Sequence, residues 1–128
     1  MLPDYWMRRD ALYPRDMTPN IEHNAEIMVG LANQLLTRFG QGRKVTSGWR
    51  PPSVNQNTPG ASRTSKHMTA QAIDLADPDG DLDDWCMSSV GQRILIELGL
   101  WLEHPFNTPK WCHVQSIPPP SGNRVFYR

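Results

Sequence analysis

The 128-residue sequence has little of several features that commonly identify a function. Its 13 basic and 13 acidic residues cancel, and it has no run of lysine or arginine, which argues against a nucleic-acid partner. No apolar run approaches the roughly 20 residues that cross a membrane, and the first residues, MLPDYWMRRDALYP, lack the apolar core of a signal peptide. We therefore expect no nucleic-acid or membrane partner, and synthesis in the cytoplasm without a signal peptide.

Cysteine is equally scarce. Cys86 and Cys112 allow one disulfide at most, which excludes a small fold held together by several bridges. In a protein made in the cytoplasm we expect two reduced thiols, although the sequence leaves a bridge open. The length is that of one domain, residues 1–128, with enough chain to bury a core. We expect a monomer.

Two segments predict helices. Thr18 offers a capping hydroxyl before Pro19, and the apolar stripe that follows stops at Gly40, a typical helix end. Residues 81–99 predict a second helix, with acidic residues in the first turn and glycine at the end.

Short strands are expected over residues 44–49, 72–76, 100–102, 111–115 and 124–128. Since most of them fall late in the chain, beside two helices, the pattern favours an α+β fold with a small antiparallel sheet and flanking helices.

The predicted strands carry residues that can bind a metal. In Ala72–Ala76 the apolar Ile73 and Leu75 share one face, which leaves Asp74 on the other. In WCHVQ, residues 111–115, His113 shares a face with Trp111 and Gln115, whereas Cys112 points toward the core.

His67, in the loop before Asp74, gives a third candidate ligand, and catalytic zinc sites use three protein ligands and an open position. Spacing alone leaves ordinary roles open for all three: a loop histidine, a strand-end aspartate and a core histidine.

Three segments together carry a more specific signal: SGWRP at 47–51, SKHMTAQAID at 65–74 and GLWLEHPFNTPKWCHVQ at 99–115. In this order they resemble the zinc D-Ala-D-Ala peptidases of the M15 family, which share their fold with the Hedgehog signalling domain. The resemblance covers nearly the whole chain and is strongest to small phage and prophage enzymes. It implies a bound Zn²⁺ held by His67, Asp74 and His113, and it places Arg50 near the scissile carbonyl.

One position departs from the family pattern. Ala70 stands where the family has glycine, so a positive φ there would strain the loop that carries His67.

Two adjacent residues are candidates for the general base. Some relatives place an acidic residue a few positions before the last ligand, but Pro109 and Lys110 stand there in this chain. Glu103 is expected to share a face with Trp101 and to look toward His113, and so is the predicted base. His104 has the opposite phase, and we expect it to orient substrate or to be an ordinary loop residue.

The expected function is a zinc D,D-peptidase that acts on peptidoglycan stem peptides at the cell wall or periplasm, as a phage endolysin does with the help of a holin. The choice between carboxypeptidase and endopeptidase stays open. The alternative is a non-catalytic, zinc-stabilised binding or virion component with the same fold, which would not need Arg50 and Glu103.

The acidic stretch DPDGDLDD, residues 77–84, is similar in composition to the start of an EF-hand calcium loop. Its glycine is fourth rather than sixth, and position twelve is Ser88 rather than glutamate. We expect a solvated turn and a helix N-terminus there.

Overall fold

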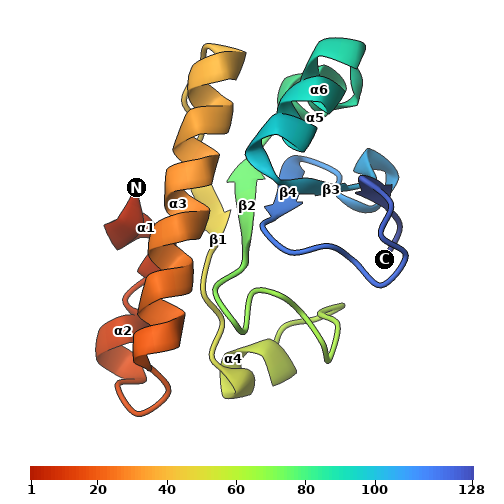
Figure 1. Ribbon diagram of the computed structural model, residues 1–128. Helices are drawn as coiled ribbons and strands as arrows, with labels where there is room; N and C mark the ends of the chain where they lie inside the picture. Colours follow the sequence, from red (N-terminus) through yellow and green to blue (C-terminus); the bar gives the residue numbers. More distant parts are fainter.

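A five-stranded sheet organises the computed structural model, which describes residues 1–128 (Figure 1). The strand order is β1-β2-β4-β3-β5. The strands are β1 (Val45–Ser47), β2 (Ala72–Ala76), β3 (Trp101–Glu103), β4 (Trp111–Gln115) and β5 (Val125–Phe126). Helices flank this sheet, which confirms the expected α+β class.

The sheet is mixed, because its last strand runs parallel to its neighbour. The pairs β1–β2, β2–β4 and β3–β4 are antiparallel, as expected, but β5 pairs parallel with β3. After β4, the proline-rich segment 116–124 carries the chain past β3 to the free edge of the sheet, and the chain therefore enters β5 in the direction of β3.

The long helix α3 (Pro19–Phe39) forms as its sequence predicts. The Thr18 hydroxyl accepts a hydrogen bond from the Ile21 backbone at 3.2 Å, and Gly40 ends the helix with a φ of 96°. Its buried face packs on the sheet and on α6, so this helix supplies much of the core.

The single helix expected over residues 81–99 is two helices, α5 (Asp81–Met87) and α6 (Ser89–Leu98). Ser88 between them has an extended ψ of 164°, and its hydroxyl caps α6 by accepting from the Gly91 backbone at 3.1 Å. Gly91 lies so close to α5 that a Cβ there would be 1.9 Å from the Trp85 carbonyl oxygen. This close approach permits the tight turn that breaks the predicted helix.

Four further short helices were not expected: α1 (Leu2–Trp6), α2 (Arg9–Leu12), α4 (Pro52–Gln56) and the 3-10 turn η1 (Pro105–Asn107). In α1 the buried Tyr5 hydroxyl donates to the Ala72 carbonyl at 2.7 Å. The N-terminal segment is thereby attached to β2, the strand that carries Asp74.

The core lies between α3, α6 and one face of the sheet. Ile73, Leu75, Cys112 and Val114 are fully buried in it, so the predicted strand phases are confirmed and Cys112 is a core residue. Both cysteines are free and buried. No helix combines the length and the apolar character needed to span a membrane.

The acidic stretch 77–84 is a helix N-terminus, as expected, but two of its aspartates are buried rather than solvated. The Asp77 carboxylate accepts from the backbone of Leu82 and Asp83, each at 2.9 Å, and so caps α5. The Asp83 carboxylate accepts from the Thr108 hydroxyl at 3.2 Å, while its Oδ1 has no hydrogen-bond partner. Burial raises the pKa of Asp83 to about 7.

This raised pKa predicts a pH-dependent stability. Between about pH 4 and pH 7 the folded protein keeps a proton on Asp83 that the unfolded chain has lost, so the free energy of unfolding falls as pH rises through this window. Asp83→Asn, which resembles the protonated form, should be up to a few kcal/mol more stable than the wild type at pH 8 and similar to it at pH 4. Urea unfolding at both values tests this, with the exposed Asp84→Asn as the matched control. An equal difference at both pH values would contradict it.

Candidate metal centre

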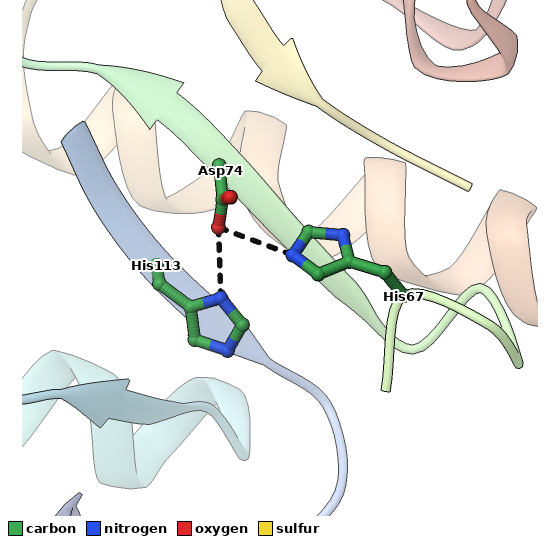
Figure 2. Close-up of side chains that lie close together, drawn as sticks. All are labelled: His67, Asp74 and His113. Carbon is green, nitrogen blue, oxygen red and sulfur yellow. Dashed lines mark hydrogen bonds and ion pairs between the residues drawn. The ribbon is translucent and has the colours of Figure 1, made fainter. Parts of the chain in front are cut away.

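His67, Asp74 and His113 converge on one buried point (Figure 2). One potential ligand atom from each residue lies within 4.8 Å of the others. Asp74 Oδ1 is 3.2 Å from His67 Nε2 and 2.8 Å from His113 Nδ1. Figure 2 shows both rings directed at this oxygen, on the side of the sheet away from α3. The structure thus brings together the three predicted ligands.

Strand pairing positions two of these residues. Asp74 of β2 and His113 of β4 are direct partners in the antiparallel register. Directly opposed side chains on one face of such a pair are about 5 Å apart at Cβ, close enough to share an ion. Ile73 and Cys112 face the core instead, so alternation alone puts the carboxylate and the imidazole on the open face.

His67 reaches the same point from a loop that is held by the segment 48–50. Its Nδ1 donates to the Gly48 carbonyl at 2.8 Å, and its own carbonyl accepts from the Arg50 backbone at 3.0 Å. The Trp49 indole donates to the Met68 carbonyl at 3.1 Å. These three bonds explain why the SGWR segment accompanies a ligand that lies 19 residues after Gly48.

Gly48 itself admits no side chain. A Cβ there would lie 2.0 Å from the Tyr5 carbonyl oxygen, a contact that the backbone must move to relieve. We expect Gly48→Ala to lower the free energy of unfolding by about 2–3 kcal/mol and to weaken metal binding, since the displaced carbonyl is the one that orients His67. Denaturant unfolding and zinc titration test both effects. Gly42→Ala, where a Cβ meets nothing within 4 Å, is the control.

Outer hydrogen bonds fix which nitrogen of each ring faces inward. The outer nitrogen of His67 meets the Gly48 carbonyl, and His113 Nε2 meets the Gln115 side-chain oxygen at 2.9 Å. Both acceptors lack a proton, so each outer nitrogen carries the proton of a neutral imidazole. In this tautomer His67 Nε2 and His113 Nδ1 are the nitrogens available to a metal, and without a metal a proton on either one is donated to Asp74 Oδ1. Histidines that bind metals are oriented in this way.

This donor set fits zinc. Two imidazole nitrogens and one carboxylate oxygen are ligand atoms that zinc prefers, and three protein ligands leave a position for water or substrate. Burial lowers the pKa of His67, which keeps its inner nitrogen unprotonated at neutral pH. Burial alone would raise the pKa of Asp74, but the neighbouring His67 and His113 hold it well below its usual range. Burial alone would lower the pKa of His113, but its hydrogen bond to Asp74 raises it. A metal at this site would therefore displace a proton from His113, while Asp74 is already ionised and His67 already neutral.

The departure at Ala70 has a structural consequence. Ala70 has a φ of 58°, in the left-handed region that favours glycine, so the loop after His67 does need the conformation that glycine adopts at no cost. Left-handed alanine costs about 1–2 kcal/mol. Its methyl group is fully buried in the core, which offsets part of that cost, and the ligand geometry is retained.

Arg50 lies beside the ligands. Its Nη2 is 3.7 Å from Asp74 Oδ2, and its other nitrogens donate to the side-chain oxygens of Ser47 at 3.1 Å and Asn55 at 3.3 Å. Ser47 of β1 pairs with Asp74 of β2, so the guanidinium is anchored to the strand next to the one that carries the ligand. Arg50 thus presents a fixed positive charge at the metal centre.

Glu103, at the end of β3, is 4% exposed, and its Oε1 lies 4.0 Å from His113 Nδ1. Its Oε2 is buried without a hydrogen-bond partner, and burial raises the pKa of this carboxyl group. A buried carboxylate with one oxygen, Oε1, directed at a candidate metal ligand is placed to act as a general base.

His104 does not line the same cleft. Its ring stacks on Tyr127 with centroids 4.5 Å apart, and its Nδ1 accepts from the Phe106 backbone at 3.0 Å. Since His104 has the opposite strand phase to Glu103, the structure brings Glu103 and not His104 to the ligands.

A cleft of about 420 Å³ opens above the three ligands. Arg50 and Glu103 lie in its walls, a hydroxyl-rich loop of residues 61–66 forms one rim, and residues 126–128 form the other. The cleft can therefore admit an extended peptide next to the metal centre.

Some roles were not predicted from the sequence. Gln115 was predicted to share a face with His113 but was given no function. In the structure its Oε1 accepts from His113 and its Nε2 donates to the Ile117 carbonyl at 2.9 Å. The available signal was that Gln115 follows His113 by two residues on one strand, which places both side chains on the same face. The carbonyl role of Gly48 and the anchoring by Asn55 had no signal in the sequence.

Comparison with known protein families gives a match to the family described as Peptidase M15 over residues 13–97, more than half of the chain. The matched stretch contains Arg50, His67 and Asp74 and ends before Glu103 and His113. No curated protein and no solved structure matches the chain. Glu103 and His113 are therefore assigned from their positions beside His67 and Asp74.

Proposed function

Because the chain belongs to the M15 peptidase family, we propose that it is a zinc metallopeptidase that hydrolyses peptide bonds involving D-amino acids in bacterial peptidoglycan. The observation that carries this proposal is the convergence of His67, Asp74 and His113 in a cleft whose walls hold a buried carboxylate and a fixed guanidinium. The stem peptides are proposed as substrates because the sequence segments resemble those of D-Ala-D-Ala peptidases.

The residues divide the chemistry between them. Zinc held by the three ligands would act as a Lewis acid that polarises the scissile carbonyl and lowers the pKa of a bound water. Glu103 accepts the proton of the attacking water and passes it to the leaving amine. Arg50 donates hydrogen bonds to the negative charge that develops on the carbonyl oxygen. Each group is held by the fold before substrate arrives, so little reorganisation is needed during the reaction.

Arg50 gives a direct prediction. Arg50→Ala should retain zinc but lower turnover about a hundredfold or more, the usual cost of removing one donor to an oxyanion. Zinc content by elemental analysis and kcat on a purified muropeptide are the measurements. Arg43→Ala, which removes an arginine outside the cleft, serves as the control. Unchanged kinetics in Arg50→Ala would reduce this residue to a structural ion pair with Asp74.

The site of action follows from the substrate. We propose that the protein is made in the bacterial cytoplasm and acts as a monomer on the cell wall or in the periplasm, as a small phage endolysin does, with a holin providing the route. The resemblance to phage and prophage enzymes supports this part of the proposal.

Digestion of purified peptidoglycan tests the function. Zinc-loaded protein should release new muropeptides that mass spectrometry identifies, and a chelator should abolish the release. The mass of the products also separates a carboxypeptidase, which removes a terminal residue, from an endopeptidase, which opens a cross-link. If fully zinc-loaded protein leaves every muropeptide intact, the alternative of a non-catalytic binding or virion component replaces this proposal.

A further inference from the structure

The last residues of the described chain form a wall of the catalytic cleft. In the parallel pair β3–β5, Glu103 is the register partner of Phe126, and the His104 backbone donates to the Phe126 carbonyl at 2.7 Å. This segment therefore lies directly beside the proposed general base.

The last three side chains all line the cleft but make different contacts. Phe126 meets the His113 ring edge-on with centroids 6.0 Å apart, whereas Tyr127 stacks on His104. Arg128 is the one of the three that reaches Glu103.

Arg128 connects the two rims of the cleft. Its Nη1 donates to the Gly60 carbonyl at 2.8 Å, and its Nη2 lies 3.5 Å from Glu103 Oε2. The side chain is 51% exposed, whereas that of Glu103 is 6% exposed, so the arginine reaches from the surface to a buried carboxylate.

The two oxygens of Glu103 thus have different surroundings. Oε1 faces His113 Nδ1 at 4.0 Å, and Oε2 faces Arg128 without forming a hydrogen bond to any group. Arg50, the other arginine that lines the cleft, is engaged with Asp74, Ser47 and Asn55. The ion pair with Arg128 is therefore the interaction that distinguishes the two ends of the Glu103 carboxylate.

We propose that Arg128 is a positioning residue: it attracts Oε2 of Glu103 and, anchored on Gly60, keeps Oε1 directed at the metal centre. This inference rests on the proposed function, in which Glu103 is the general base. Because the anchor is a backbone carbonyl on the opposite rim, the orientation of the base depends on the loop around Gly60 as well as on β3.

Kinetics on a purified muropeptide test the proposal with three variants. Arg128→Ala should lower kcat about 10–100-fold, because a misplaced catalytic group costs up to about a hundredfold. KM, zinc content and melting temperature should not change. Arg128→Lys should recover part of the rate, and guanidinium ion at non-denaturing concentration should partly rescue Arg128→Ala. Arg93→Ala removes an exposed arginine of α6, away from the cleft, and should have wild-type kinetics.

Crystal structures of the zinc-loaded wild type and Arg128→Ala provide a readout that does not depend on turnover. The carboxylate of Glu103 should rotate in the variant, so that Oε1 moves away from His113. An unchanged carboxylate would overturn the proposal even if the wild type proved inactive on peptidoglycan, which by itself would overturn only the proposed function. An unchanged kcat, or a rise in KM alone, would also overturn it, the latter by making Arg128 a substrate-binding residue.

Discussion

His67→Ala, Asp74→Ala and His113→Ala should each lower zinc affinity by more than about a hundredfold and abolish turnover. Removal of a group that merely orients a ligand already costs about 10–100-fold in metal affinity, and these residues supply the ligand atoms themselves. Asp74→Ala should have the largest effect, because its carboxylate contacts both imidazoles and Arg50. Elemental analysis after dialysis, together with a muropeptide assay, measures both losses.

The exposed His23→Ala is the matched control, since it removes an imidazole from α3 without touching the site. Full zinc occupancy in all three ligand variants would end the assignment of the metal centre. Circular dichroism on each variant separates loss of zinc from loss of the fold.

Removal of zinc from the wild type should also lower its stability. A metal that binds only the folded form adds about 4 kcal/mol at a free concentration about 1,000 times Kd, which corresponds to a fall of about 10–15 °C in melting temperature on chelation. The ligand variants should show no such shift with chelator.

Glu103→Gln should retain zinc and lose about 10²–10⁴-fold in turnover, the range that general-base catalysis contributes. Glutamine keeps the size of the side chain and its place between His113 and Arg128, but it cannot accept the proton of an attacking water. Burial raises the pKa of Glu103, which makes its carboxylate a stronger base than an exposed glutamate.

His104→Ala is the paired variant. Because His104 does not line the cleft, the His104→Ala variant should keep most of the activity and all of the zinc. The assignment fails if Glu103→Gln stays active while His104→Ala loses turnover.

Local patterns in the sequence determined much of the framework of the site. Thr18 and Gly40 delimit α3 because a capping hydroxyl and a left-handed glycine act within one turn of the helix. The alternation in residues 72–76 and 111–115 put Asp74 and His113 on an open face because the side-chain period of a strand is a local property. These features depend on residues that are neighbours in the chain.

Contacts between distant residues were decided only by the tertiary structure. The Gly48 carbonyl that orients His67 and the Arg128 guanidinium that faces Glu103 come from segments 19 and 25 residues away from their partners, and a carbonyl leaves no trace in a sequence. The break at Ser88 depends on how closely Gly91 approaches Trp85. The sequence alone therefore determined which residues can bind the metal, because residue type and strand phase are local. The tertiary structure decided how their rings and carboxylates are oriented, because orientation depends on hydrogen bonds that form only when the chain has folded.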